Sequence, residues 1–172
     1  MKEDTPVAET KEIEILKTAL LLEKRGRAFY QRVARDAESQ AVKELFTIMA
    51  EEEGKHIDFL SKQFANFSAN GEFLEQQPDS AARSAVQEIL SSEIRKQISA
   101  AGFEAAAISA AIEMENRAID IYSGRAGSSE EPREKSLYEW LAQWERGHLK
   151  FLAEINDELL EDIWYESSFW PF

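Results

Sequence analysis

The chain of 172 residues contains no cysteine. Disulfide bonds, thiolate nucleophiles, cysteine-ligated zinc and iron–sulfur clusters are therefore excluded. Glycine and proline are also scarce, with 7 and 4 residues, which is too few for the frequent turns of an all-β fold. Because no run of about 18 apolar residues occurs, the sequence predicts no membrane-spanning helix, and we expect a cytoplasmic location.

Basic residues are outnumbered by acidic ones. Lys and Arg together number 20 against 33 Asp and Glu, which gives a formal net charge of −13. A surface field of this sign repels nucleic acid and anionic membranes, so neither is expected as a partner. Metal ions and cationic partners are favoured instead. With 44% hydrophobic and 31% charged residues, the composition fits one all-α domain with a substantial core.

The chain has only two histidines, and each follows a glutamate by three residues, as Glu53-x-x-His56 and Glu145-x-x-His148. Residues three apart on a helix share one face, about one turn from each other. A carboxylate and an imidazole at this spacing can therefore bind one metal ion together. A single pair of this kind is more often an exposed helix pair, but two such pairs favour a metal site.

Both pairs belong to an internal repeat, which appears when the sequence is shifted by 92 positions without gaps. The repeat indicates a duplicated helical hairpin. It also adds one glutamate and one tyrosine to each half. The matched positions that carry chemistry are Glu23 with Glu115, Tyr30 with Tyr122, Glu53 with Glu145, and His56 with His148.

The spacing of apolar residues predicts four helices within one domain at 10–160. They run over about 10–36, from about 40 onward, over 104–125 and over 131–160, and they turn the repeated glutamates and histidines inward. Residues 1–9 are expected to form a flexible arm. Residues from about 67 to 102 are expected to form a long crossover with a short helix at 81–98. Residues 161–172 are expected to form an aromatic tail docked on the bundle, on a second subunit or on another protein.

Four buried carboxylates need compensation, because a desolvated carboxylate without a partner costs several kcal/mol or becomes protonated. Their combined charge of −4 equals the charge of two divalent cations. Ligation by many carboxylate oxygens with one imidazole for each ion is typical of iron or manganese. We therefore expect two iron ions, with manganese or zinc as possible substitutes.

With these residues in this order, the chain resembles the rubrerythrin branch of the ferritin-like di-iron proteins, which carry a Glu on two helices and Glu-x-x-His on two others. The resemblance covers about 10–160 and implies a ferritin-like four-helix bundle made of two hairpins. It implies that Glu23 joins Glu145 and His148 at one ion, and that Glu115 joins Glu53 and His56 at the other. Glu53 and Glu145 are expected to bridge.

The resemblance implies peroxide reduction, or oxidation of Fe(II) with O₂ or H₂O₂. Tyr30 and Tyr122 would donate hydrogen bonds to ligand carboxylates or to a bound oxygen species, although plain core aromatics are an equal alternative. Gly26 and Ala118 would leave space for the oxidant. The chain departs from rubrerythrins at Ala118, where they carry a further glutamate. Because it also lacks a cysteine-rich rubredoxin tail, its electrons would come from a separate donor protein or from ferrous iron.

Two other functions stay open at this point: iron storage in a ferritin-type shell, and a structural bundle with a vestigial metal site. Hydroxylation of an organic substrate is a more distant alternative. A homodimer is expected from the aromatic tail. The remaining acids near the motifs, which are Glu51, Glu52, Glu113 and Asp120, are interpreted as a solvated face that pairs with Arg25 and Arg117.

Overall fold

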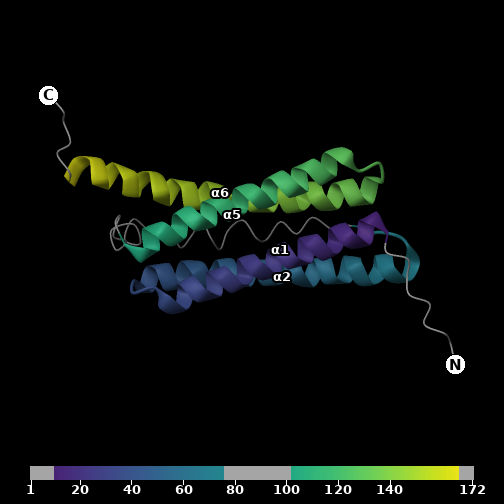
Figure 1. Cartoon of the computed structure of the whole chain (residues 1–172), viewed down its shortest axis with the longest axis horizontal. Helices are drawn as coiled ribbons and strands as arrows, with labels where there is room; N and C mark the ends of the chain where they lie inside the picture. The colour runs from purple at the N-terminus through teal and green to yellow at the C-terminus, as the bar shows by residue number, and fades with distance from the viewer. Residues whose placement is uncertain (1–9, 76–101, 167–172) are drawn as a thin grey trace.

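The computed structural model describes residues 10–75 and 102–166, which form four long helices and no strand. They are α1 (Lys11–Asp36), α2 (Gln40–Asn70), α5 (Phe103–Ser128) and α6 (Pro132–Glu166). Figure 1 shows two antiparallel hairpins, α1 with α2 and α5 with α6, lying side by side. The predicted all-α four-helix bundle is confirmed. The arm at 1–9 and the expected helix at 81–98 lie outside the described residues, as does 167–172 of the aromatic tail.

Side chains and a glycine fix the ends of the first hairpin. Thr10 and Ser39 cap α1 and α2, since their hydroxyl oxygens accept hydrogen bonds from the amides of Ile13 and Val42 at 3.4 Å each. At the far end of α2, Gly71 adopts a φ of 70°, and its amide donates to the carbonyl of Phe67 at 2.8 Å. This left-handed C-cap suits a glycine.

Three helices extend further than the sequence predicts. Helix α2 reaches Asn70, α5 runs through Gly124 and Gly127 to Ser128, and α6 continues to Glu166. A glycine inside a helix costs only about 1 kcal/mol relative to alanine. The end of α5 is anchored by Arg125, whose Nε donates to Glu134 of α6 at 2.8 Å. Helix α5 therefore continues through both glycines and ends at Ser128.

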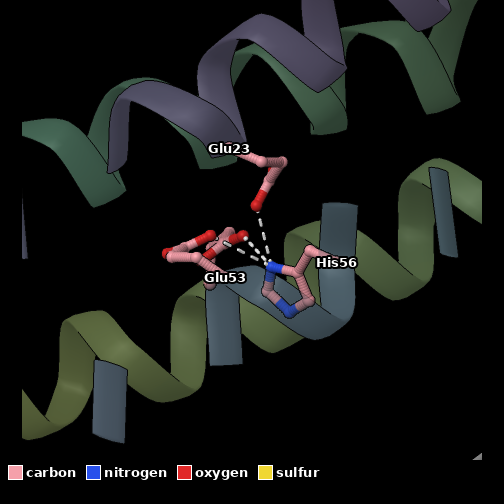
Figure 2. Close-up of side chains that lie close together, drawn as sticks. Glu23, Glu53 and His56 are labelled. Atoms are coloured by element: carbon pink, nitrogen blue, oxygen red, sulfur yellow. Dashed lines mark hydrogen bonds and ion pairs between the residues drawn. The ribbon is translucent and has the colours of Figure 1, made fainter. Parts of the chain in front are cut away.

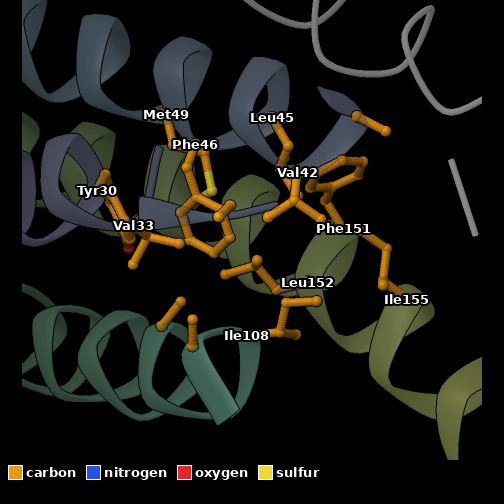
Figure 3. Close-up of a cluster of buried hydrophobic side chains, with 14 of the residues drawn as sticks. Tyr30, Val33, Val42, Leu45, Phe46, Met49, Ile108, Phe151, Leu152 and Ile155 are labelled. Atoms are coloured by element: carbon orange, nitrogen blue, oxygen red, sulfur yellow. The ribbon is translucent and has the colours of Figure 1, made fainter. Parts of the chain in front are cut away.

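The apolar core consists of two clusters, and each draws side chains from all four helices. One contains Tyr30 and Val33 of α1, several residues of the first half of α2, Ile108 of α5 and Leu152 of α6; Figure 3 shows it. The other contains Phe73, which follows α2, and residues from the other parts of the same helices: Leu16, Ala19, Leu60, Ala118, Tyr122, Ala126, Leu137, Tyr138, Leu141 and Ala142. The segments between them, where the repeated glutamates lie, therefore occupy the middle of the bundle.

One side chain ties the two hairpins together near the first cluster. The carboxylate of Glu104, in the first turn of α5, accepts hydrogen bonds from the amides of Glu38 and Ser39 at 3.0 and 3.4 Å. It thereby fixes the start of α5 against the turn between α1 and α2. Across 10–75 and 102–166, none of the helices has the length and apolar content needed to cross a bilayer.

Candidate metal centre

The bundle brings the six predicted glutamates and histidines together in its middle. None of the six is more than 4% exposed. Glu23 comes from α1, Glu53 and His56 from α2, Glu115 from α5, and Glu145 and His148 from α6. They form two overlapping groups, in each of which four ligand atoms lie within 4.8 Å of one another: Glu23, Glu53, His56 and Glu145 in the first, and Glu53, Glu115, Glu145 and His148 in the second.

The first group is arranged around the Nδ1 atom of His56. This nitrogen lies 2.9 Å from Oε2 of Glu23, 3.3 Å from Oε2 of Glu53 and 3.2 Å from Oε1 of Glu145. Figure 2 shows the Glu23 and Glu53 carboxylates converging on the ring from two different helices. The three oxygens and the nitrogen therefore face one shared point.

The second group repeats this arrangement around His148. Its Nδ1 atom lies 3.1 Å from Oε2 of Glu145, 3.5 Å from Oε1 of Glu115 and 3.9 Å from Oε1 of Glu53. Glu53 and Glu145 thus reach both histidines, and each does so with a different oxygen. This is the placement expected of two carboxylates that bridge a pair of ions.

The pairing of the remaining two glutamates differs from the prediction. Glu23 lies in the group of His56 and Glu115 in the group of His148, whereas the resemblance had assigned them the other way round. The reason is the hairpin itself: α1 packs along α2, and α5 along α6. Each single glutamate therefore faces the histidine of its own hairpin.

Two tyrosine hydroxyls cross between the hairpins. Tyr30 of α1 donates a hydrogen bond to Oε1 of Glu115 on α5, and Tyr122 of α5 donates to Oε1 of Glu23 on α1. Both rings are buried. Each tyrosine thereby orients the unshared glutamate of the other hairpin, as partners of metal-binding carboxylates do.

The residues present fit two divalent cations. Among the described residues no Lys or Arg forms an ion pair with Glu23, Glu53, Glu115 or Glu145, although all four are buried. Both histidines turn Nδ1 toward the carboxylates, while their Nε2 atoms are buried and find no hydrogen-bond partner in the described structure. Uncompensated buried carboxylates of this kind call for cations.

Without a cation, burial and neighbouring charges favour the protonated forms of several of these glutamates and histidines. Burial, reinforced by the charge of Glu145, raises the pKa of Glu115 to about 7 and raises that of Glu53 well above its usual range. Burial lowers the pKa of His56, but the charges of Glu145 and Glu23 outweigh it, so that this pKa is raised. Metal binding must therefore displace protons.

Comparison with known proteins identifies the family. The sequence profile of the Rubrerythrin family matches residues 14–156, which include all six residues of the two groups. The chain belongs to the rubrerythrin family. The structure is similar to that of a hypothetical protein from Pyrococcus furiosus, with 26% sequence identity and a TM-score of 0.59, over 91% of this chain and 94% of that one. No curated protein matches the chain.

Beside the His56 half of this rubrerythrin-family site lie two tryptophans that the sequence analysis missed. The ring centroids of Trp144 and Trp140 lie 4.9 and 5.9 Å from that of His56, and 5.1 Å from each other. Their repeat-equivalent positions are Ile48 and Glu52. Because the repeat does not conserve them, only their spacing of four residues, next to the ligand motif on α6, could have indicated their place.

Two predictions about the neighbouring charges are wrong. Glu52 is not on a solvated face: it is 3% exposed, and its carboxylate pairs with the Lys55 ammonium at 2.7 Å. Arg25 and Arg117 form no ion pair with the acids of the described structure, so the expected pairing does not occur. Glu51, Glu113 and Asp120 are exposed, as expected.

A cavity of about 280 Å³ opens onto the carboxylates between α1 and α5. Gly26 and Ala118, which the sequence analysis linked to entry of the oxidant, both line it. Its lining contains repeat-equivalent residues of the two helices: Leu22 corresponds to Met114, and Arg25 corresponds to Arg117. The cavity therefore lies over the face of the site that both hairpins share, where Glu23, Glu53, Glu115 and Glu145 form part of its lining.

Proposed function

We propose that the chain is a di-iron redox protein that reduces peroxide or oxidises Fe(II) with O₂ or H₂O₂. One observation carries the proposal: Glu53 and Glu145 each place one oxygen near His56 and the other near His148. Such a shared pair supports two ions held side by side rather than two separate sites. Glu23 and His56 would complete one ion's ligands, and Glu115 and His148 those of the other.

Charge supports two ions as well. Four ionised carboxylates and two neutral imidazoles carry −4, which two divalent cations neutralise, so the buried group then needs no proton. A ligand set of carboxylate oxygens and one imidazole for each ion can bind iron, manganese or zinc, with an affinity that differs between the metals. Only a redox-active metal would add electron transfer, and membership of the rubrerythrin family favours iron.

The protein's own side chains would hold the carboxylates of the site in position. When bound, two ferrous ions supply the two electrons that reduce a peroxide. The hydroxyls of Tyr30 and Tyr122 hold their protons at Glu115 and Glu23, because burial and these carboxylates raise the pKa of each tyrosine well above its usual range. The tyrosines therefore act as donors that keep the carboxylates oriented while the charge of the site changes.

The surroundings separate this chemistry from bulk water. Apolar clusters flank the site at both ends, and the cavity between α1 and α5 offers an opening through which an oxidant would enter. Since the sequence contains no cysteine, it holds no cysteine-ligated iron centre of its own. A separate donor protein, or further ferrous iron, would return the electrons.

Anaerobic reconstitution with Fe(II) tests the proposal. Elemental analysis should find two irons for each chain, and stopped-flow mixing with one equivalent of H₂O₂ or with O₂ should produce a near-ultraviolet ferric absorption band. The relative rates with the two oxidants distinguish peroxide reduction from oxidation with O₂. Zero or one iron with no band would refute the redox function and favour a structural bundle, whereas a large oligomer that takes up many irons would favour storage.

A further inference from the structure

We propose that the cavity over the metal-binding residues takes an organic hydroperoxide that carries a carboxylate, with its carboxylate at Arg25 and Arg117 and its peroxide group at the glutamates. This inference rests on the proposed redox function and adds a substrate class to it. Three features of the cavity support it: its size, its apolar wall and its pair of arginines.

The cavity is larger than hydrogen peroxide requires. The cavity has a volume of about 280 Å³, whereas a water molecule occupies about 30 Å³ in the liquid and H₂O₂ has only one oxygen atom more than water. Ligand pockets for small organic molecules begin near this volume, at about 300 Å³. Space of this kind selects for a substrate with a carbon chain.

The wall of the cavity is mostly apolar. Leu21, Leu22, Met114 and Ile121 line it from α1 and α5. Leu21 and Ile121 are 48% and 36% exposed, so apolar surface continues to the opening. An aliphatic chain would cover this surface and release its water, which favours binding of an organic peroxide over a purely polar one.

Arg25 and Arg117 supply the charged end of the recognition. They are repeat-equivalent, each lies two residues after a glutamate of the site, and both are exposed at the cavity. Neither forms an ion pair within the described parts of the chain, although the protein carries an excess of acidic residues. Two free guanidinium groups on opposite helices of one opening can bind a carboxylate, which forms charge-assisted hydrogen bonds with arginine.

Two small residues keep the inner part of the cavity open. Gly26 has no side chain there, and its repeat-equivalent Ala118 has only a methyl group. Glu53 and Glu145 line the same cavity. A ligand anchored at the exposed arginines would therefore extend its far end toward the shared carboxylates. The peroxide group of the proposed substrate is therefore placed at this far end.

The reaction balances with the electrons of the proposed site. With two ferrous ions bound, the O–O bond of ROOH would break by taking up one electron from each ion, which would become ferric, and two protons from water. The products are ROH and H₂O. No other oxidant or reductant takes part in this half-reaction, and the external donor of the proposed function restores the ferrous state.

Binding is tested first on protein loaded with Zn(II), which excludes redox turnover. Calorimetric titration with hexanoate should give saturable binding, and 1-hexanol, which lacks the charge, should bind at least tenfold more weakly. In the variant R25Q/R117Q the affinity for hexanoate should fall by roughly tenfold or more. The matched control K24Q/R27Q removes the same charge from exposed positions of α1 outside the cavity lining and should keep most of the affinity.

Turnover is then compared in the iron-loaded protein. Stopped-flow oxidation of the diferrous protein at low peroxide concentration should be faster with 6-hydroperoxyhexanoate than with neutral tert-butyl hydroperoxide. The ratio of the two rates should fall toward one in R25Q/R117Q and should be kept in the control K24Q/R27Q. No saturable binding of hexanoate, equal binding by both double variants, or no preference for the anionic peroxide would overturn the inference. If H₂O₂ also fails to oxidise the loaded protein, the proposed function itself is wrong.

Discussion

Tyr122 on α5 donates its hydroxyl hydrogen bond to Glu23 on α1, across the interface between the two hairpins. The repeat-equivalent contact joins Tyr30 on α1 to Glu115 on α5. Each hairpin therefore positions a carboxylate that its partner hairpin contributes to the site. The duplication has produced two halves that depend on each other for the orientation of their ligands.

Replacing Tyr122 with Phe should weaken metal binding. The substitution keeps the ring but leaves Glu23 without its buried donor, and loss of such a partner typically lowers metal affinity by about 10- to 100-fold. Competition for Zn(II) or Fe(II) with a chelator of known affinity measures the change. The variant Tyr30→Phe should have the same effect on the Glu115 side.

Tyr138→Phe is the matched control for these two variants. Tyr138 is also buried, and its ring centroid lies 6.1 Å from that of Tyr122, but its hydroxyl finds no hydrogen-bond partner among the described residues. Its removal should leave metal affinity unchanged and the free energy of unfolding unchanged or slightly higher. Equal losses of affinity in all three variants would indicate a packing effect and contradict the orienting role.

Shared and unshared glutamates should respond differently to substitution. Glu53→Gln removes the negative charge that both groups share and should lower occupancy at both ions, whereas Glu23→Gln removes charge from one group and should mainly affect one ion. Elemental analysis after equilibration with limiting Fe(II) counts the ions retained. Glu52→Gln serves as control, because Glu52 is equally buried but pairs with Lys55 and belongs to neither group. Similar stoichiometries for the Glu53 and Glu23 variants would argue against bridging.

The six residues of the site could be predicted from the sequence because the internal repeat and the helical spacing identify the same positions. The shift of 92 residues aligns His56 with His148, and spacing by three and four places Glu23 and Glu53 on the inner faces of their helices. The pairing of Glu23 with His56 could not be predicted in this way. It depends on which helices are neighbours, and helical periodicity contains no information about that arrangement.

Burial of Glu52 also escaped prediction, for a related reason. A charged residue next to other charged residues is usually solvated, and nothing local distinguishes Glu52 from the exposed Glu51. Yet the repeat-equivalent position of Glu52 is Trp144, which contacts His56 of the other hairpin. The two equivalent positions thus hold different side chains on the two hairpins, and the burial of Glu52 follows from packing that local composition does not encode.

The metal-free protein should lose stability as pH rises. Burial raises the pKa of Glu115 from 4.5 to about 7, so the folded state retains a proton that the unfolded chain releases. That contribution is fully present below pH 4.5 and lost as pH rises through 7, and it amounts to about 3 kcal/mol for this residue. Calorimetry of the metal-free protein should therefore show a falling Tm between pH 5 and 8.

Metal should reverse this dependence, because cations require the deprotonated carboxylates and displace the protons. The Tm of the Zn(II)-loaded protein should hold or rise over the same interval, and at a free ion concentration 100 times Kd the gain is about 2.7 kcal/mol for each site. Glu115→Gln should flatten the slope of the metal-free protein. A metal-free Tm that rises between pH 5 and 8 would show that these protons are not held as described.

The substitution Gly26→Ala should raise the stability of the protein and slow the entry of peroxide to the site. A Cβ at position 26 would lie 3.5 Å from Cδ of Glu53, an ordinary van der Waals contact that narrows the cavity. In a helix the change from Gly to Ala stabilises by up to about 1 kcal/mol, so Tm should rise while oxidation of the diferrous protein by peroxide slows. Gly124→Ala on α5 has open space around its Cβ and should raise Tm by a similar amount without slowing oxidation. If both variants react as fast as the parent protein, peroxide reaches the metal-binding residues by a route other than the opening between α1 and α5.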